Sequence, residues 1–113
     1  MAEPDPVTQE RIARNDDAFR RANRRIAAVA SGLPLEKAPF ICECADPRCT
    51  AIVGLSQDEY AEIRASPRRF FCVPDHLEAA EGMARVVTER DGYLVVEKVG
   101  HAGEVAEQLD RSA

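Results

Sequence analysis

The chain has 113 residues, of which 45% are hydrophobic, and a formal net charge of −5 at pH 7. That length corresponds to one domain, and the negative charge argues against strong, non-specific binding of nucleic acid by the whole chain. No apolar run approaches the roughly 18 residues of a membrane span, and the acidic start does not resemble a signal peptide. We therefore expect a cytoplasmic protein without membrane contact. Tryptophan is absent and aromatic residues make up only 5% of the chain, which predicts an aliphatic core.

Residues 8–31 are predicted to form the first helix. Ile12, Phe19 and Ile26 recur at intervals of seven residues and give a narrow apolar stripe. Gly32 followed by Pro34 is a stop signal. The arginines on the other faces are interpreted as a solvated surface with acidic partners one helical turn away. The expected pairs are Glu10–Arg14, Asp16–Arg20 and Asp17–Arg21.

This helix belongs to the expected interaction element, residues 1–34. A narrow apolar stripe and Arg-rich faces are hard to bury together in one small domain, which favours a protein partner. A second copy of the chain, joined through a short coiled coil, is one such partner. The alternative is a nucleic-acid surface, whose phosphate contacts would make binding strongly salt-dependent. It would use Arg20, Arg21, Arg24 and Arg25, helped by Arg68 and Arg69.

Residues 40–53 are predicted to form a β-hairpin that carries cysteines. Residues 40–44 would be the first strand and residues 50–53 the second. The turn between them has suitable chemistry, because the Asp46 carboxylate can cap the backbone and Pro47 fixes its own φ.

A short helix, a strand and a second hairpin are expected next. Ser56 as N-cap and Glu59 three residues later form a capping box, and Ser66-Pro67 should end the helix near Ala65. Residues 70–73 read as a strand. The runs 83–90 and 93–99 flank Asp91-Gly92, which is a strong hairpin signal. Beyond Gly100 we expect a tail with at most a short frayed helix.

Three of the four cysteines, Cys42, Cys44 and Cys49, lie within eight residues. Residues i and i+2 of a strand point to one face, and the turn can return Cys49 to the other two. Three thiolates could therefore gather around one centre. In a reducing compartment, clustered cysteines bind metal more often than they form disulfides. Redox chemistry, a disulfide and simple packing are the alternatives to a metal site.

A structural zinc site needs a fourth nitrogen or sulfur ligand. Cys72 and His76 both follow the short helix, and sequence reasoning does not separate them. His101, beyond the second hairpin, is the weakest candidate. Cys72 lies in the apolar run FFCV and also fits a buried core residue. In a redox sensor it would be the resolving thiol.

The chain resembles a family of small uncharacterised bacterial proteins over residues 12–98. The segments FRRANRRI, FICECADPRCT, LSQDEYAEIR, VPDH and RVVTERDGYLVVEK carry the resemblance. The family's recurring quartet of three cysteines and one histidine implies Cys42, Cys44, Cys49 and His76 as ligands, with Cys72 in the core. This chain departs from the family at Asp75, where the family has a glycine that can adopt positive φ freely. The resemblance implies no established activity.

These observations predict an α+β fold made of an N-terminal helix, a Cys-bearing β-hairpin, a short helix, a strand and a C-terminal β-hairpin. We divide the chain into residues 1–34, the helix; residues 35–100, a zinc-binding α+β domain; and residues 101–113, a tail. Four protein ligands leave a Zn²⁺ ion no open position for catalysis. We therefore expect a non-enzymatic, regulatory zinc-binding module that acts through protein contacts. The alternatives are a nucleic-acid-binding zinc protein and a thiol redox sensor.

Overall fold

The computed structural model of the chain describes residues 6–44, 46, 48–76 and 84–112. The predicted α+β fold is confirmed, with one difference: the chain ends in a helix rather than in the second hairpin. In chain order the elements are α1 (Pro6–Ala30), β1 (Ala38–Ile41), β2 (Ile52–Leu55), α2 (Gln57–Arg64), β3 (Arg69–Cys72), β4 (Ala84–Arg90), β5 (Tyr93–Lys98) and α3 (Gly100–Ser112).

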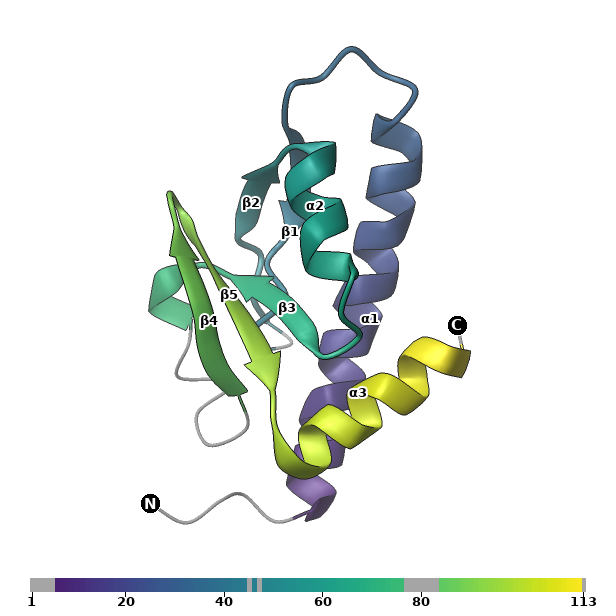
Figure 1. Cartoon of the computed structure of the whole chain (residues 1–113), viewed down its shortest axis with the longest axis vertical. Coiled ribbons are helices and arrows are strands. Elements are labelled where there is room, and N and C mark those ends of the chain that lie inside the picture. The colour runs from purple at the N-terminus through teal and green to yellow at the C-terminus, as the bar shows by residue number, and fades with distance from the viewer. Residues whose placement is uncertain (1–5, 45, 47, 77–83, 113) are drawn as a thin grey trace.

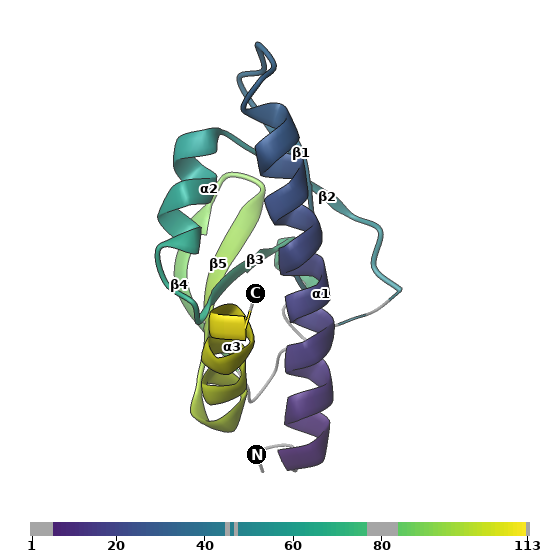
Figure 2. The same ribbon diagram turned by 90° about the vertical axis from the view of Figure 1, so that its right-hand side faces the viewer.

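The long helix α1 runs along the long axis of the molecule (Figure 1). The β1–β2 pair and α2 lie beside its C-terminal half, and α3 crosses its N-terminal half (Figures 1 and 2). The three-stranded sheet has the order β3-β5-β4, with β4 farthest from α1. Among the described helices, none has the length and apolar composition that a membrane span requires.

Both sheets are antiparallel. The predicted hairpin at Asp91-Gly92 is confirmed, and Gly92 has a φ of 86°, which a glycine adopts without steric cost. β5 is the central strand of its sheet and is buried from Tyr93 to Val96. Its continuous apolar run therefore reflects burial on both faces.

The N-terminus of α2 is fixed by the predicted capping box, which is confirmed. The Ser56 hydroxyl accepts a hydrogen bond from the Glu59 backbone N–H at 3.1 Å, and the Glu59 carboxylate accepts one from the Ser56 N–H at 2.9 Å. The bond from Ser56 is the main cause of the lowered pKa of Glu59. The helix ends at Arg64, with Ala65 as C-cap, as expected. This register turns Tyr60 and Ile63 toward the core.

The core combines aliphatic side chains with a group of aromatic rings, so the prediction of an aliphatic core is only partly correct. Phe40 stacks on Tyr60 with ring centroids 4.5 Å apart, and Phe71 meets both rings edge-on. Phe70 and Tyr93 are buried as well. The chain has few aromatic residues, but it concentrates them inside, where each buries a large apolar area.

The inward face of α1 is polar, which corrects the prediction of an apolar stripe. Phe19 and Ile26 are only half-buried, and the side chain of Ile12 lies outside the described residues. Among the described side chains of the helix, the buried ones, Ala30 apart, are Asp16, Asp17, Arg20 and Asn23. The polar residues that interrupt the stripe in the sequence are thus the ones that pack inside.

The expected charge pairs of α1 are partly correct. Arg21 contacts Asp17 at 2.8 Å, as predicted. Arg20 also pairs with Asp17, at 2.7 Å, rather than with Asp16, and it is 1% exposed rather than solvated. Asp16 instead forms a buried ion pair with Lys98 of β5. The side chain of Glu10 lies outside the described residues.

The segment beyond Gly100, predicted to be a tail, forms the 13-residue helix α3. Gly100 begins it with a φ of 57°. α3 packs on α1, where Arg20 donates a hydrogen bond to the Ala106 carbonyl at 3.0 Å and Arg24 pairs with Asp110. The helix therefore completes the interior instead of trailing from it.

Candidate metal centre

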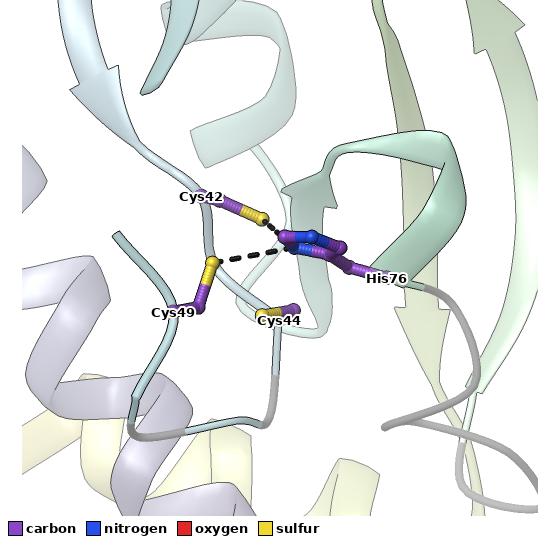
Figure 3. A group of neighbouring side chains, drawn as sticks. All are labelled: Cys42, Cys44, Cys49 and His76. Carbon is purple, nitrogen blue, oxygen red and sulfur yellow. Dashed lines mark hydrogen bonds between the residues drawn. The ribbon is translucent and has the colours of Figure 1, made fainter. Parts of the chain in front are cut away.

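Three short segments supply the four side chains of the candidate metal centre, Cys42, Cys44, Cys49 and His76 (Figure 3). The first two cysteines follow β1, and Cys49 precedes β2. His76 lies in a 3₁₀ turn, residues 74–76, that follows β3. The backbone N–H of His76 donates to the Val73 carbonyl at 2.9 Å, which fixes this turn. Segments far apart in the chain therefore converge on one point.

The four ligand atoms all lie within 4.8 Å of one another. His76 Nδ1 lies 3.2 Å from Cys49 Sγ and 3.5 Å from Cys42 Sγ. A tetrahedral zinc ion, with bonds of about 2.3 Å to sulfur and about 2.05 Å to nitrogen, separates sulfur from nitrogen by about 3.6 Å and two sulfurs by about 3.8 Å. The side chains therefore need only small adjustments to surround such an ion.

Cys72 and His101, the other candidates for the fourth ligand, lie outside this group. Cys72 is buried in β3, as expected for a core residue. Burial, with a smaller contribution from the nearby Cys44 thiol, raises the pKa of its thiol to about 12. The raised pKa keeps this sulfur protonated at neutral pH and disfavours a reactive thiolate. His101 belongs to α3, where its ring lies 3.9 Å from the Glu104 carboxylate.

Both strands of the hairpin lie farther from the cysteine loop than predicted, and β2 is Ile52–Leu55 rather than residues 50–53. β1 ends at Ile41, so Cys42 and Cys44 lie beyond the strand rather than on it. Pairing continues for one more bond, from the Cys42 N–H to the Ala51 carbonyl at 3.0 Å. The predicted Asx turn is confirmed at Asp46, whose carboxylate accepts the Arg48 N–H at 2.9 Å. Pro47 lies outside the described residues.

The departure at Asp75 does not demand an unusual backbone. Among the described residues, no non-glycine residue has positive φ. Asp75 therefore reaches the turn before His76 in a conformation open to any amino acid. The loop does not need the glycine of the resembled family.

Burial controls the protonation of the two inner thiols. It raises the pKa of Cys42 to about 11 and that of Cys44 to about 12. Backbone N–H groups oppose the shift, from Val73 at the first sulfur and from Asp46 at the second. The Val73 N–H lies 3.3 Å from the Cys42 sulfur. These donors favour the thiolate form of each cysteine. A bound cation that displaced the protons would favour the same form.

The outer edge of the site is open to solvent. Cys49 and His76 are half-buried, whereas Cys42 and Cys44 are buried. A surface depression runs along this edge and is lined by Cys44, Asp46, Cys49, Thr50, Ala51, Asp75 and His76. An ion can therefore reach the ligands without opening the core.

Sequence reasoning missed a buried charged residue beside the site, Glu43. It is 1% exposed and lies between the two inner cysteines. Its carboxylate accepts hydrogen bonds from Arg64 at 2.8 and 3.1 Å and from Asn23 at 2.8 Å. One signal was available: in an extended chain, Glu43 points away from the face that Cys42 and Cys44 share. A charged residue facing the core there requires buried partners.

Most of the arginines named for a nucleic-acid surface have acidic partners in the structure. Arg20 is buried, and Arg21 shares the carboxylate of Asp17. The other pairs are Arg24–Asp110, Arg68–Glu107 and Arg69–Glu97. Arg25 is exposed. These pairings favour a structural interpretation of the arginines.

Comparisons with models of protein families, with curated proteins and with solved structures find no match for this chain. The resemblance noted in the sequence is therefore still a prediction. The centre that they form is compatible with a metal-binding module.

Proposed function

We propose that this chain is a small zinc-binding module in which Cys42, Cys44, Cys49 and His76 hold one structural Zn²⁺ ion. The observation that carries the proposal is the convergence of three sulfurs and one imidazole nitrogen within 4.8 Å. Soft thiolates with one imidazole suit zinc better than they suit magnesium or calcium, which prefer oxygen ligands.

The donor set supports a structural rather than a catalytic ion. Catalytic zinc keeps a position open for water or substrate, whereas four protein ligands close the tetrahedron. The ion would join the loop after β1, the start of β2 and the turn after β3. Such a bond between distant segments supplies folding free energy that a small core provides only in part.

Metal analysis of the purified chain and two variants tests this proposal. We expect about one zinc per wild-type chain and a clear loss of zinc in His76→Ala, because three ligands bind more weakly than four. Cys72→Ala is the matched control, since it removes a thiol from the core beside the centre, and it should retain zinc. Equal zinc content in all three proteins would exclude His76 as a ligand. Loss of zinc only in Cys72→Ala would identify Cys72, and not His76, as the fourth ligand.

We further propose that the module acts through protein contacts made by the end of α1 and the loop that follows it. Val29, Leu33 and Leu35 are 68%, 51% and 49% exposed, and with Ile26 and Pro39 they line an apolar surface groove. Exposed apolar patches of this kind mark interaction sites. A second copy of the chain is the simplest partner.

Light scattering coupled to size-exclusion chromatography tests the homodimer. We expect a dimer for the wild type and a monomer for a Val29→Asp, Leu33→Ser double variant, because charge and polarity oppose burial of the groove. Deletion of the helix is unsuitable, since its buried side chains belong to the fold. Val86→Ser, another exposed apolar site at 44% exposure on β4, is the control and should not change the mass. A monomeric wild type at high concentration would contradict the homodimer.

A further inference from the structure

We propose that Glu43 is the positioning residue of the metal centre. With Arg64 and Asn23 it would hold the Cys42–Cys44 segment so that both thiols face the ion. This inference rests on the proposed function, because it assigns Glu43 a role in metal binding by the four ligands. It goes further by naming the groups that prepare the site before the ion arrives.

The directions of the Cys42, Glu43 and Cys44 side chains support this role. The sulfurs of Cys42 and Cys44 both belong to the ligand group, whereas the Glu43 carboxylate between them contacts Arg64 and Asn23 instead. Fixing the Glu43 side chain therefore fixes the orientation of both thiols. The carboxylate is fixed at both oxygens: Oε2 accepts from Asn23 and Arg64, and Oε1 accepts from Arg64 and the Phe71 N–H.

Glu43 also contacts the segment that leads to His76. The Glu43 N–H donates to the Phe71 carbonyl at 2.8 Å, and the Phe71 N–H donates to the Glu43 carboxylate at 3.3 Å. Two residues further along, the Val73 N–H approaches the Cys42 sulfur. The turn with His76 follows at once. Glu43 thus sets the distance between the cysteine loop and the histidine turn.

The charges of Glu43 and Arg64 also support this role. A carboxylate buried in the core would be strongly unfavourable without a cation. Arg64 supplies that cation in a two-pronged contact, and its side chain is only 12% exposed. Its guanidinium also lies over the rings of Tyr60, Phe70 and Phe71, which hold it in place. Asn23 completes the set, since its amide also exchanges two 2.8 Å hydrogen bonds with the backbone of Ile41.

Competition with a chromogenic zinc chelator measures the effect on affinity. Glu43→Gln keeps the shape of the side chain but removes the charge, and Arg64→Lys keeps the charge but loses the two-pronged contact. Residues that orient metal ligands typically change affinity by 10–100-fold, and we expect about that loss in both variants. Val105→Ala is the control for lost stability, because Val105 is buried in α3 outside the core cluster that holds the cysteines.

Cobalt(II) bound in place of zinc gives a readout that lost stability alone does not change. The visible spectrum of cobalt reports the geometry of its ligands, so at saturation Glu43→Gln should shift the ligand-field bands while Val105→Ala should not. If Glu43→Gln does not fold in the presence of zinc, Arg64→Lys takes its place. Its zinc affinity and cobalt spectrum are then compared with those of Val105→Ala.

Two negative results are distinguishable. A wild type that binds zinc tightly, with variants whose affinity and cobalt spectrum match those of Val105→Ala, would overturn the positioning role and leave the proposed function intact. A wild type that binds no zinc would overturn the proposed function and this inference together.

Discussion

Asp16 illustrates how far burial changes a single residue. It is fully buried on the inward face of α1, and Lys98 is its ion-pair partner. Desolvation raises the pKa of this carboxyl to about 6, although the charges of Lys98 and Arg20 oppose the shift. The folded state therefore binds a proton at Asp16 more readily than the unfolded chain does.

The sign of the resulting pH dependence follows from linkage. Because the folded-state pKa is raised, the stabilisation from protonated Asp16 is present below about pH 4 and is lost as the pH rises through about 6. A shift of about two pKa units corresponds to roughly 3 kcal/mol. Asp16→Asn removes this contribution, so its unfolding free energy should fall less than that of the wild type between pH 4 and pH 7. Urea unfolding at both pH values measures the difference.

The comparison between the two pH values isolates ionisation from the loss of the ion pair itself. Other carboxyl groups, such as Glu59 and Glu97, have lowered pKa values and give the opposite slope, but they are present in both proteins and cancel. Parallel pH profiles for wild type and variant would show that Asp16 keeps an ordinary pKa.

Three residues of the candidate metal centre could be found from the sequence, which left Cys72 and His76 open as the fourth ligand. The polar interior could not be found. Spacing and turn chemistry brought Cys42, Cys44 and Cys49 together, because all three lie in one short loop. The burial of Arg20 depends on a carbonyl 86 residues away. No local pattern encodes such a partner, and charged residues on a helix are usually solvated.

Elements with strong local signals were also predicted well. The capping box and the Asp-Gly turn each depend on a few adjacent residues, and both lie where the sequence placed them. α3 was missed because its start, Gly-His-Ala-Gly, has low helix propensity. Its packing on α1 provides the stabilisation that propensity does not.

Gly103 in α3 provides a test of that packing. In an exposed helix, replacing glycine by alanine normally stabilises by about 1 kcal/mol. Here a Cβ atom would lie 2.6 Å from Arg68 Nη1 and 2.8 Å from the Lys98 carbonyl, which is closer than such contacts allow. We expect Gly103→Ala to destabilise the fold by about 1–3 kcal/mol, as measured by urea unfolding.

Gly32→Ala is the matched control for this change. Its Cβ would meet only the Val29 carbonyl, at 3.8 Å, and its φ is not positive. We expect its unfolding free energy to stay within about 0.5 kcal/mol of the wild type. A Gly103→Ala protein as stable as this control would mean that α3 does not pack closely against the end of β5.

For the whole molecule, removal of the proposed zinc ion should lower stability strongly. An ion present at a thousandfold excess over its dissociation constant stabilises the folded state by about 4 kcal/mol. For a domain of this size that corresponds to a fall in Tm on the order of 15 °C when a chelator is added. Circular dichroism during heating measures the fall, and added zinc should reverse it.

His76→Ala serves as the reference for this treatment. Because it lacks one ligand, its melting temperature should already be low and should respond little to the chelator. An equal response of wild type and variant would indicate that the chelated ion binds elsewhere on the chain.

The long reach of the interior contacts has a consequence for synthesis. A ribosome releases the chain from its N-terminus, so Asp16 leaves the exit tunnel well before Lys98, and α3 follows Lys98. Until Lys98 has emerged, Asp16 on the inner face of α1 lacks this ion-pair partner. Premature termination after the second hairpin would leave Arg20 without the Ala106 carbonyl that it contacts in the complete fold. The contact between Arg20 and α3 can therefore form only after Ala106 has emerged.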